Sequence, residues 1–159
     1  MKKKLSVMMV VLLLLQVMGA TGAVYGMPAP SAITCSAGTS SVAAGSTSGS
    51  VIDSDLTVSD VAGTELTGAK VYITTGFDAL TDTLTFANTT SISGIYVPAT
   101  GVLTLSGTAP VADYQAALRT VRLKTGLTQT GEKTVVFSLG DKLKFGSHYY
   151  EAVSASQIS

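Results

Sequence analysis

The sequence predicts an all-β fold, a Greek-key β-sandwich of the cadherin or immunoglobulin type, with one short helix near residues 110–121. Three observations predict it. Apolar and polar residues alternate in several short runs, turn-forming residues separate these runs, and a single segment has helical spacing. Many short strands punctuated by turns are typical of two packed antiparallel sheets.

The predicted strands lie within residues 51–142, which we expect to form the folded domain. In each run the apolar residues fall at every second position, so one face of the strand is apolar. β-Branched and aromatic residues are frequent there, as suits a pleated, half-buried surface. The alternating sets are Leu56 and Val58, Val71 and Ile73, Leu84 and Phe86, Leu103 and Leu105, and Val135, Phe137 and Leu139.

One segment has a different period. Its apolar residues recur at helical spacing, at Val111, Tyr114, Leu118 and Val121. Pro110 suits the first turn of a helix, and Asp113 and Arg119 suit its positive and negative ends. We expect this helix to close one end of the sandwich, so that packing and helix-end charge explain these residues without a binding role.

The N-terminus has the three parts of a secretory signal peptide, and we expect residues 1–23 to be removed on export. Lys2, Lys3 and Lys4 precede an apolar stretch at residues 5–18, and small residues follow at 19–23. The alternative is a membrane anchor, but a bilayer span needs about 20 apolar residues. We therefore expect a secreted or cell-surface protein that meets the membrane only through its export signal.

Residues 24–50 are rich in Ser, Thr, Gly, Ala and Pro, a composition that predicts a linker. Weak edge strands are also compatible with Ala32-Ile33-Thr34 and Ser41-Val42-Ala43. Cys35 is the single cysteine, so no internal disulfide can form. Loss of the three leader lysines leaves seven basic against ten acidic residues, a balance that argues against nucleic acid as a partner.

Three motifs follow one another in the predicted domain: Leu66-Thr67-Gly68-Ala69, Gly101-Val102-Leu103-Thr104-Leu105, and Tyr114-Gln115-Ala116-Ala117-Leu118-Arg119. In this order they resemble the cadherin-like repeats of large bacterial surface and adhesin-type proteins, distant relatives of the chondroitin-sulfate-proteoglycan repeats. The resemblance implies an extracellular structural module that spaces or presents adhesive elements. Its partners would be other cell-surface modules or proteins, and the oligomeric state stays open.

Some repeats of this kind bind calcium, so the resemblance also implies a calcium-dependent adhesion module as an alternative. The candidate ligands here are Asp53, Asp55 and Asp60. Calcium takes about six to eight oxygen ligands, so three carboxylates would need carbonyls, water or a neighbouring module to complete a site. The early acidic position of such repeats is replaced here by Val42-Ala43-Ala44-Gly45. We expect no other cofactor.

Residues 143–159 form a tail in which residues 145–154 resemble the opening strand of a C-type-lectin-like module. The rest of such a module would not fit in so few residues. The tail is therefore either a frayed end or the start of a missing module. The second reading makes the chain a truncated carbohydrate-binding surface protein, with carbohydrate as a partner only through that missing module.

The sequence does not predict an enzyme. His148 is the only histidine, and Gly45-Ser46-Thr47-Ser48-Gly49 has threonine where a nucleophile elbow has serine. Asp78 and Asp82 could be imagined as a carboxylate pair for glycoside cleavage, but acids in such turns are usually solvated. Asn88-Thr89-Thr90 matches the acceptor sequence for N-glycosylation and lies in an expected exposed turn.

Overall fold

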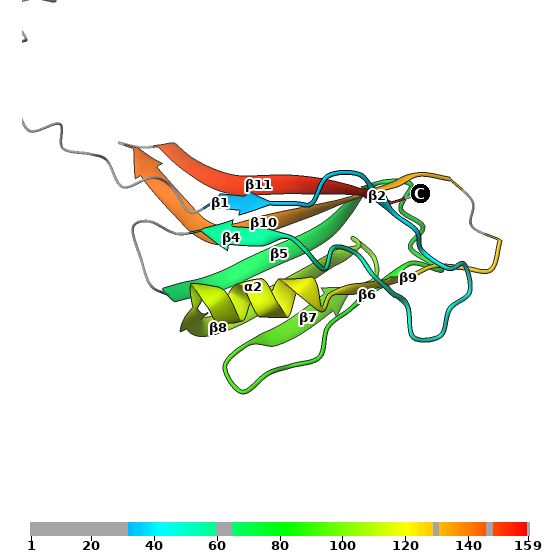
Figure 1. Ribbon diagram of the computed structural model, residues 1–159, viewed down its shortest axis with the longest axis horizontal. Coiled ribbons are helices and arrows are strands. Elements are labelled where there is room, and N and C mark those ends of the chain that lie inside the picture. The colour runs from blue at the N-terminus through cyan, green and yellow to red at the C-terminus, as the bar shows by residue number, and fades with distance from the viewer. Residues whose placement is uncertain (1–31, 60–64, 129–130, 146–147, 159) are drawn as a thin grey trace, which may run out of the picture.

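The computed structural model describes residues 32–59, 65–128, 131–145 and 148–158, and the structural statements below concern these residues. The predicted signal peptide and Asp60 lie outside them. Strands and one helix make up the fold (Figure 1). In chain order these are β1 (Ala32–Thr34), β2 (Thr39–Ser40), β3 (Ser50–Val51), β4 (Thr57–Ser59), β5 (Glu65–Thr75), β6 (Thr83–Thr85), β7 (Ser93–Val97), β8 (Val102–Pro110), α2 (Val111–Arg119), β9 (Arg122–Lys124), β10 (Lys133–Phe145) and β11 (His148–Ile158).

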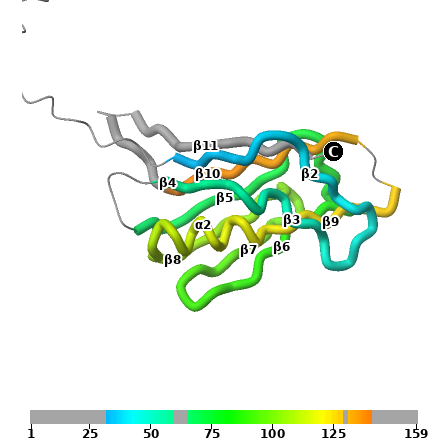
Figure 2. The backbone as a smooth tube through the Cα atoms, in the orientation of Figure 1, coloured from blue at the N-terminus to red at the C-terminus, as the bar shows by residue number. Residues whose placement is uncertain are grey.

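One large sheet forms the first layer of the sandwich. Its strand order is β2-β11-β10-β5-β8-β7, and all its pairs are antiparallel except β2 with β11. The second layer consists of the sheet β3-β9-β6, the pair β1-β4 and helix α2, which lie over one face of the large sheet (Figures 1 and 2). The predicted all-β sandwich with one short helix is confirmed, and its Greek-key path stays a prediction.

The apolar core fills the space between the layers, and the predicted alternation accounts for most of it. Alternate residues point inward along much of β5, β8 and the first part of β10, with a register shift in β5 between Leu66 and Gly68. Leu103 and Leu105 on β8, for example, are 2% and 1% exposed. A fully buried Leu, Ile or Phe contributes about 1.5–3 kcal/mol. The inward set on the large sheet is Leu66, Ala69, Val71, Ile73, Leu103, Leu105, Val135, Phe137 and Leu139. It packs against Ile52, Leu56, Val58, Leu84, Tyr114, Leu118, Val121 and Leu123.

Helix α2 lies within the second layer, where it contacts β4, β5 and β8, and it does not close an end of the sandwich as the sequence led us to expect (Figure 1). Gln115 and Arg119 lie four residues apart, on one face of the helix. The backbone N–H of Val58 donates to Gln115 Oε1 (2.9 Å), and Arg119 Nε donates to the carbonyl of Leu56 (2.8 Å). The opposite edge of β4 pairs with β1. The two side chains thus take the place of a third strand beside the β4 segment.

The N-terminal and C-terminal regions differ in part from the prediction. Ala32-Ile33-Thr34 is strand β1, whereas the second strand of this region is Thr39–Ser40 and not Ser41-Val42-Ala43. The predicted boundary at residue 142 falls inside β10, and residues 148–158 pair with β10 as β11. The tail is therefore not a frayed end. The physical reason is that β11 satisfies the second edge of β10, which would otherwise present unpaired backbone groups.

The contact between α2 and the β4 segment can be tested at Gln115. Gln115→Leu removes the acceptor of the Val58 N–H, and leaving a mostly buried donor unpaired costs about 1–3 kcal/mol. Gln115→Glu keeps an oxygen at that position and should lose less. Urea unfolding of the three proteins measures the difference. Equal unfolding midpoints for the leucine and glutamate variants would contradict the role assigned to this side chain.

Candidate functional site

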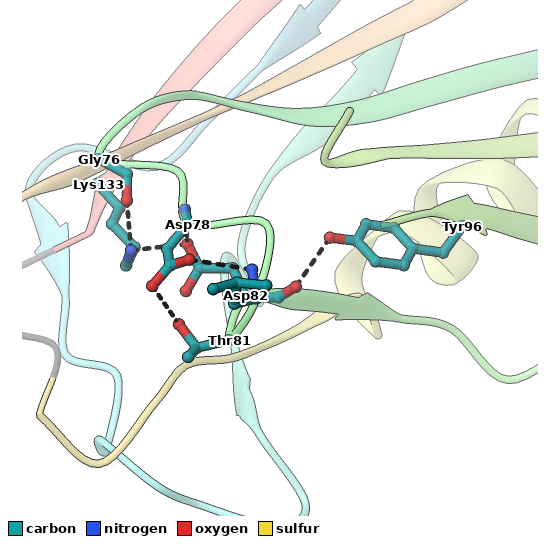
Figure 3. A network of polar contacts seen from close by, with 7 residues as sticks. Gly76, Asp78, Thr81, Asp82, Tyr96 and Lys133 are labelled. Atoms are coloured by element: carbon teal, nitrogen blue, oxygen red, sulfur yellow. Dashed lines mark hydrogen bonds and ion pairs between the residues drawn. The ribbon is translucent and has the colours of Figure 1, made fainter. Parts of the chain in front are cut away.

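The most connected polar cluster lies at the turn between β5 and β6 (Figure 3). Lys133, at the start of β10, forms an ion pair of 2.7 Å with Asp82 Oδ2. The lysine also donates to the carbonyl of Gly76, and the N–H of Asp78 donates to Asp82 Oδ2 (2.8 Å). Lys133 thereby fastens both the beginning and the end of the turn to the large sheet.

This ion pair is withdrawn from solvent. Asp82 is 2% exposed and Lys133 is 7% exposed. Breaking one partner of such a pair typically costs about 3–5 kcal/mol, because a charge is left buried and uncompensated. The second carboxylate oxygen, Asp82 Oδ1, is buried and has no hydrogen-bond partner within the described part of the chain. The arrangement therefore depends strongly on Lys133.

Asp78 and Tyr96 complete the cluster. The N–H of Leu80 and the hydroxyl of Thr81 both donate to the Asp78 carboxylate (2.9 Å each), and these bonds lower its pKa below the ordinary 3.8. Asp78 thus stabilises the fold above that value, and its contribution is lost as the pH falls below it. Tyr96 donates its hydroxyl to the carbonyl of Asp82 (3.0 Å), and burial, followed by the Asp82 charge, raises its pKa above 10.0.

Asp78 and Asp82, considered above as a carboxylate pair, are instead both occupied within the turn. The oxygens of Asp78 accept from its own loop, and Asp82 Oδ2 accepts from the lysine and from the Asp78 N–H. The cluster can hold a turn in one conformation. Lys133 was not among the predicted site residues, although it lies on the same side of its strand as Val135 and Phe137 and so occupies a core-facing position.

Of the predicted calcium ligands, Asp53 and Asp55 lie in one turn and Asp60 lies outside the described residues. Asp53 is 2% exposed, and both of its oxygens are occupied. Oδ2 accepts from the Ser36 N–H (2.8 Å), while Oδ1 accepts from the Ser36 hydroxyl (2.9 Å) and the Asp55 N–H (3.0 Å). Asp53 therefore anchors the segment after β1. Within the described ranges, no three acidic, histidine or cysteine residues gather as a metal site would require.

A shallow groove of about 530 Å³ separates the loop at residues 87–91 from helix α2. Its helix side carries Asp113, Ala116, Ala117 and Thr120, its loop side carries residues 87–91, and most of the lining surface is apolar. A second hollow of about 260 Å³ lies on the other side of the same loop. The sequence indicates a glycosylation motif in this loop but not the groove, because the helix that faces the loop is distant along the chain.

The cluster can be tested by a double-mutant cycle at the ion pair. Lys133→Met strands the buried Asp82 carboxylate and should cost about 3–5 kcal/mol. Asp82→Asn in the same chain removes that charge, so the double variant should be destabilised by less than the sum of the two single changes. Lys70→Met, at an exposed lysine of β5, is the control. Additive losses in urea unfolding would show that the two charges are not coupled.

Calcium is expected to have little effect on the melting temperature of the full chain, because Asp53 is committed to internal hydrogen bonds. Thermal unfolding at millimolar calcium and in chelator measures this. A rise of many degrees that Asp60→Ala abolishes would contradict it, and would place a calcium site at the residues after β4.

Comparison with known proteins finds a relative but no matching family. No family model matches the chain, and no solved structure matches it. Halomucin of Haloquadratum walsbyi is 44% identical over 123 residues, a match that covers 67% of this chain and 1% of halomucin. Within the described residues, no helix has the length and apolar character needed to cross a bilayer. The chain is therefore similar to one short segment of a very much longer protein.

Proposed function

We propose that the chain is an exported, non-enzymatic β-sandwich module of the cell surface that spaces or presents neighbouring elements. The observation that carries this proposal is the match to about 1% of halomucin. A sequence that occurs as a small part of a very long chain is expected of a building module. The relative's name places it with mucins, which supports a surface or secreted location, as does the predicted signal peptide.

The described structure supports a passive mechanical role. A spacer must keep its shape, and polar groups fix both the turn between the layers and the position of helix α2 within the second layer. The Lys133–Asp82 pair fixes the turn between the sheets, and Gln115 and Arg119 fix helix α2 to the β4 segment. Most hydrogen-bonding atoms of these groups are engaged in contacts within the fold, which favours a structural module over a catalytic one.

We retain the proposal that the module is cadherin-like, with other cell-surface modules or proteins as its partners.

Export is the part of this proposal that can be tested first. In the cells that make the protein, it should be found at the surface or in the medium, with an N-terminus near residue 24. Leu13→Arg places a charge in the apolar stretch and should retain the chain inside with its leader, whereas Leu13→Ile should not. Cell fractionation and mass spectrometry of the N-terminal peptide measure both. A wild-type protein in the cytoplasm with residues 1–23 intact would overturn the proposal.

A further inference from the structure

The loop between β6 and β7 holds its N-glycosylation motif in an exposed and anchored conformation. Asn88, Thr89 and Thr90 are all exposed. The loop is anchored by Ile92, which is 1% exposed and belongs to the core. A motif for N-glycosylation is useful only on an accessible segment, and this one meets that condition.

The side chain of Asn88 is held in one orientation. Its Oδ1 accepts the backbone N–H of Gly94 on β7 (2.9 Å). Because the donor is a backbone N–H, the acceptor must be the amide oxygen and not the nitrogen. In a planar carboxamide the nitrogen then points away from the β7 backbone. Nothing in the described part of the chain accepts a hydrogen bond from Nδ2.

The middle residue of the motif is fixed internally. The Thr89 N–H donates to the carbonyl of Ile92 (2.9 Å), and the Ile92 N–H donates to the Thr89 hydroxyl (3.0 Å). These two bonds close a compact turn within the loop, and neither of them involves Thr90 or the amide nitrogen of Asn88. The amide nitrogen and the Thr90 side chain are thus both left for recognition by an external enzyme.

There is also room for a first sugar beside Asn88. The groove of about 530 Å³ has Asn88 and Thr90 on one side and Asp113 and Thr120 on the other. Its volume falls within the range of about 300–1,000 Å³ that accommodates small molecules. Most of the lining is apolar, and the hydroxyl, amide and carboxylate groups among it can form hydrogen bonds with a saccharide.

From this geometry we infer that Asn88 carries an N-linked glycan, an inference that requires the export proposed above. Nδ2 attacks the anomeric carbon of an oligosaccharide held on a polyprenyl phosphate or diphosphate. The new C–N bond forms as the C–O bond to phosphate breaks, the lipid phosphate leaves with its electron pair, and a proton of Nδ2 passes to a base of the oligosaccharyltransferase. Asn88 keeps Oδ1, so the bond from Gly94 persists.

The glycan would lie beside an open strand edge. β7 pairs with β8 on one side only, and its outward face carries Ile95, 71% exposed, and Val97, 43% exposed. The side chain of Asn88 already accepts a hydrogen bond from one backbone N–H of this edge, that of Gly94. A bulky hydrophilic group at the same residue would hinder pairing with another strand, in the way that natural sheets protect their edges.

The experiment is mass spectrometry of the full chain purified from the cells that make it. Trypsin should release residues 71–119 as one peptide, since no Lys or Arg lies between Lys70 and Arg119. We expect most of this peptide to carry a glycan mass on Asn88. Thr90→Ala should return it to the mass of its sequence, and Thr90→Ser, which keeps the motif, should retain the glycan. Asn88→Asp should lose the glycan yet keep an acceptor for Gly94.

Two outcomes would overturn the inference. One is recovery of the wild-type peptide 71–119 almost entirely at its unmodified mass; the other is a glycan mass that persists in Thr90→Ala. The mass of the N-terminal peptide in the same sample shows whether the glycan inference alone has failed or the proposed function as well. A cleaved leader with an unmodified Asn88 overturns the glycan alone, whereas an intact leader in the cytoplasm overturns both. Equal melting temperatures of the alanine and serine variants after enzymatic or chemical removal of the glycan would show that the loop is intact.

Discussion

The arrangement of the two layers depends on the buried ion pair between Lys133 and Asp82. The turn that carries Asp82 joins β5 of the large sheet to β6 of the small sheet, while Lys133 belongs to β10. Tyr96 reaches the same turn from β7. Three strands of one layer therefore converge on the segment that crosses to the other layer.

The apolar core and these polar contacts have different roles. Burial of alternating residues supplies most of the driving force but is not directional, so it would tolerate several placements of short strands. Hydrogen bonds that would be left unpaired in the wrong placement select one of them. Hydrogen bonds from Gln115 and Arg119 to the backbone select the position of the β4 segment, and those of Asp53 select the position of the segment after β1. Most polar side chains of the candidate site thus serve to fix the fold.

The sequence predicted the strands and the helix whose apolar residues recur at a regular spacing. The inward faces of β5, β8 and β10 and helix α2 were predicted because each contains several apolar positions at one spacing. β2 and β3, of two residues each, are too short to show a period, and their pairing is set by distant partners. Lys133 could have been found by its inward parity. The role of Asp53 could not, because its partner Ser36 is 17 residues away and proximity to Asp55 suggested a cation instead.

In the role proposed for this chain, as one module of a longer surface protein, the edges of its large sheet are a hazard. Neighbouring modules joined by short linkers meet at effective concentrations of about millimolar, so even weak strand-to-strand pairing would occur. On one side of the large sheet, β2 pairs with only the last two residues of β11, so most of β11 also forms an edge. On the other side, β7 offers five residues and carries exposed apolar side chains. The glycan proposed at Asn88 would cover this second edge, the one whose exposed apolar side chains favour association. In a spacing role, the loop at residues 87–91 would thus serve to keep this edge from pairing.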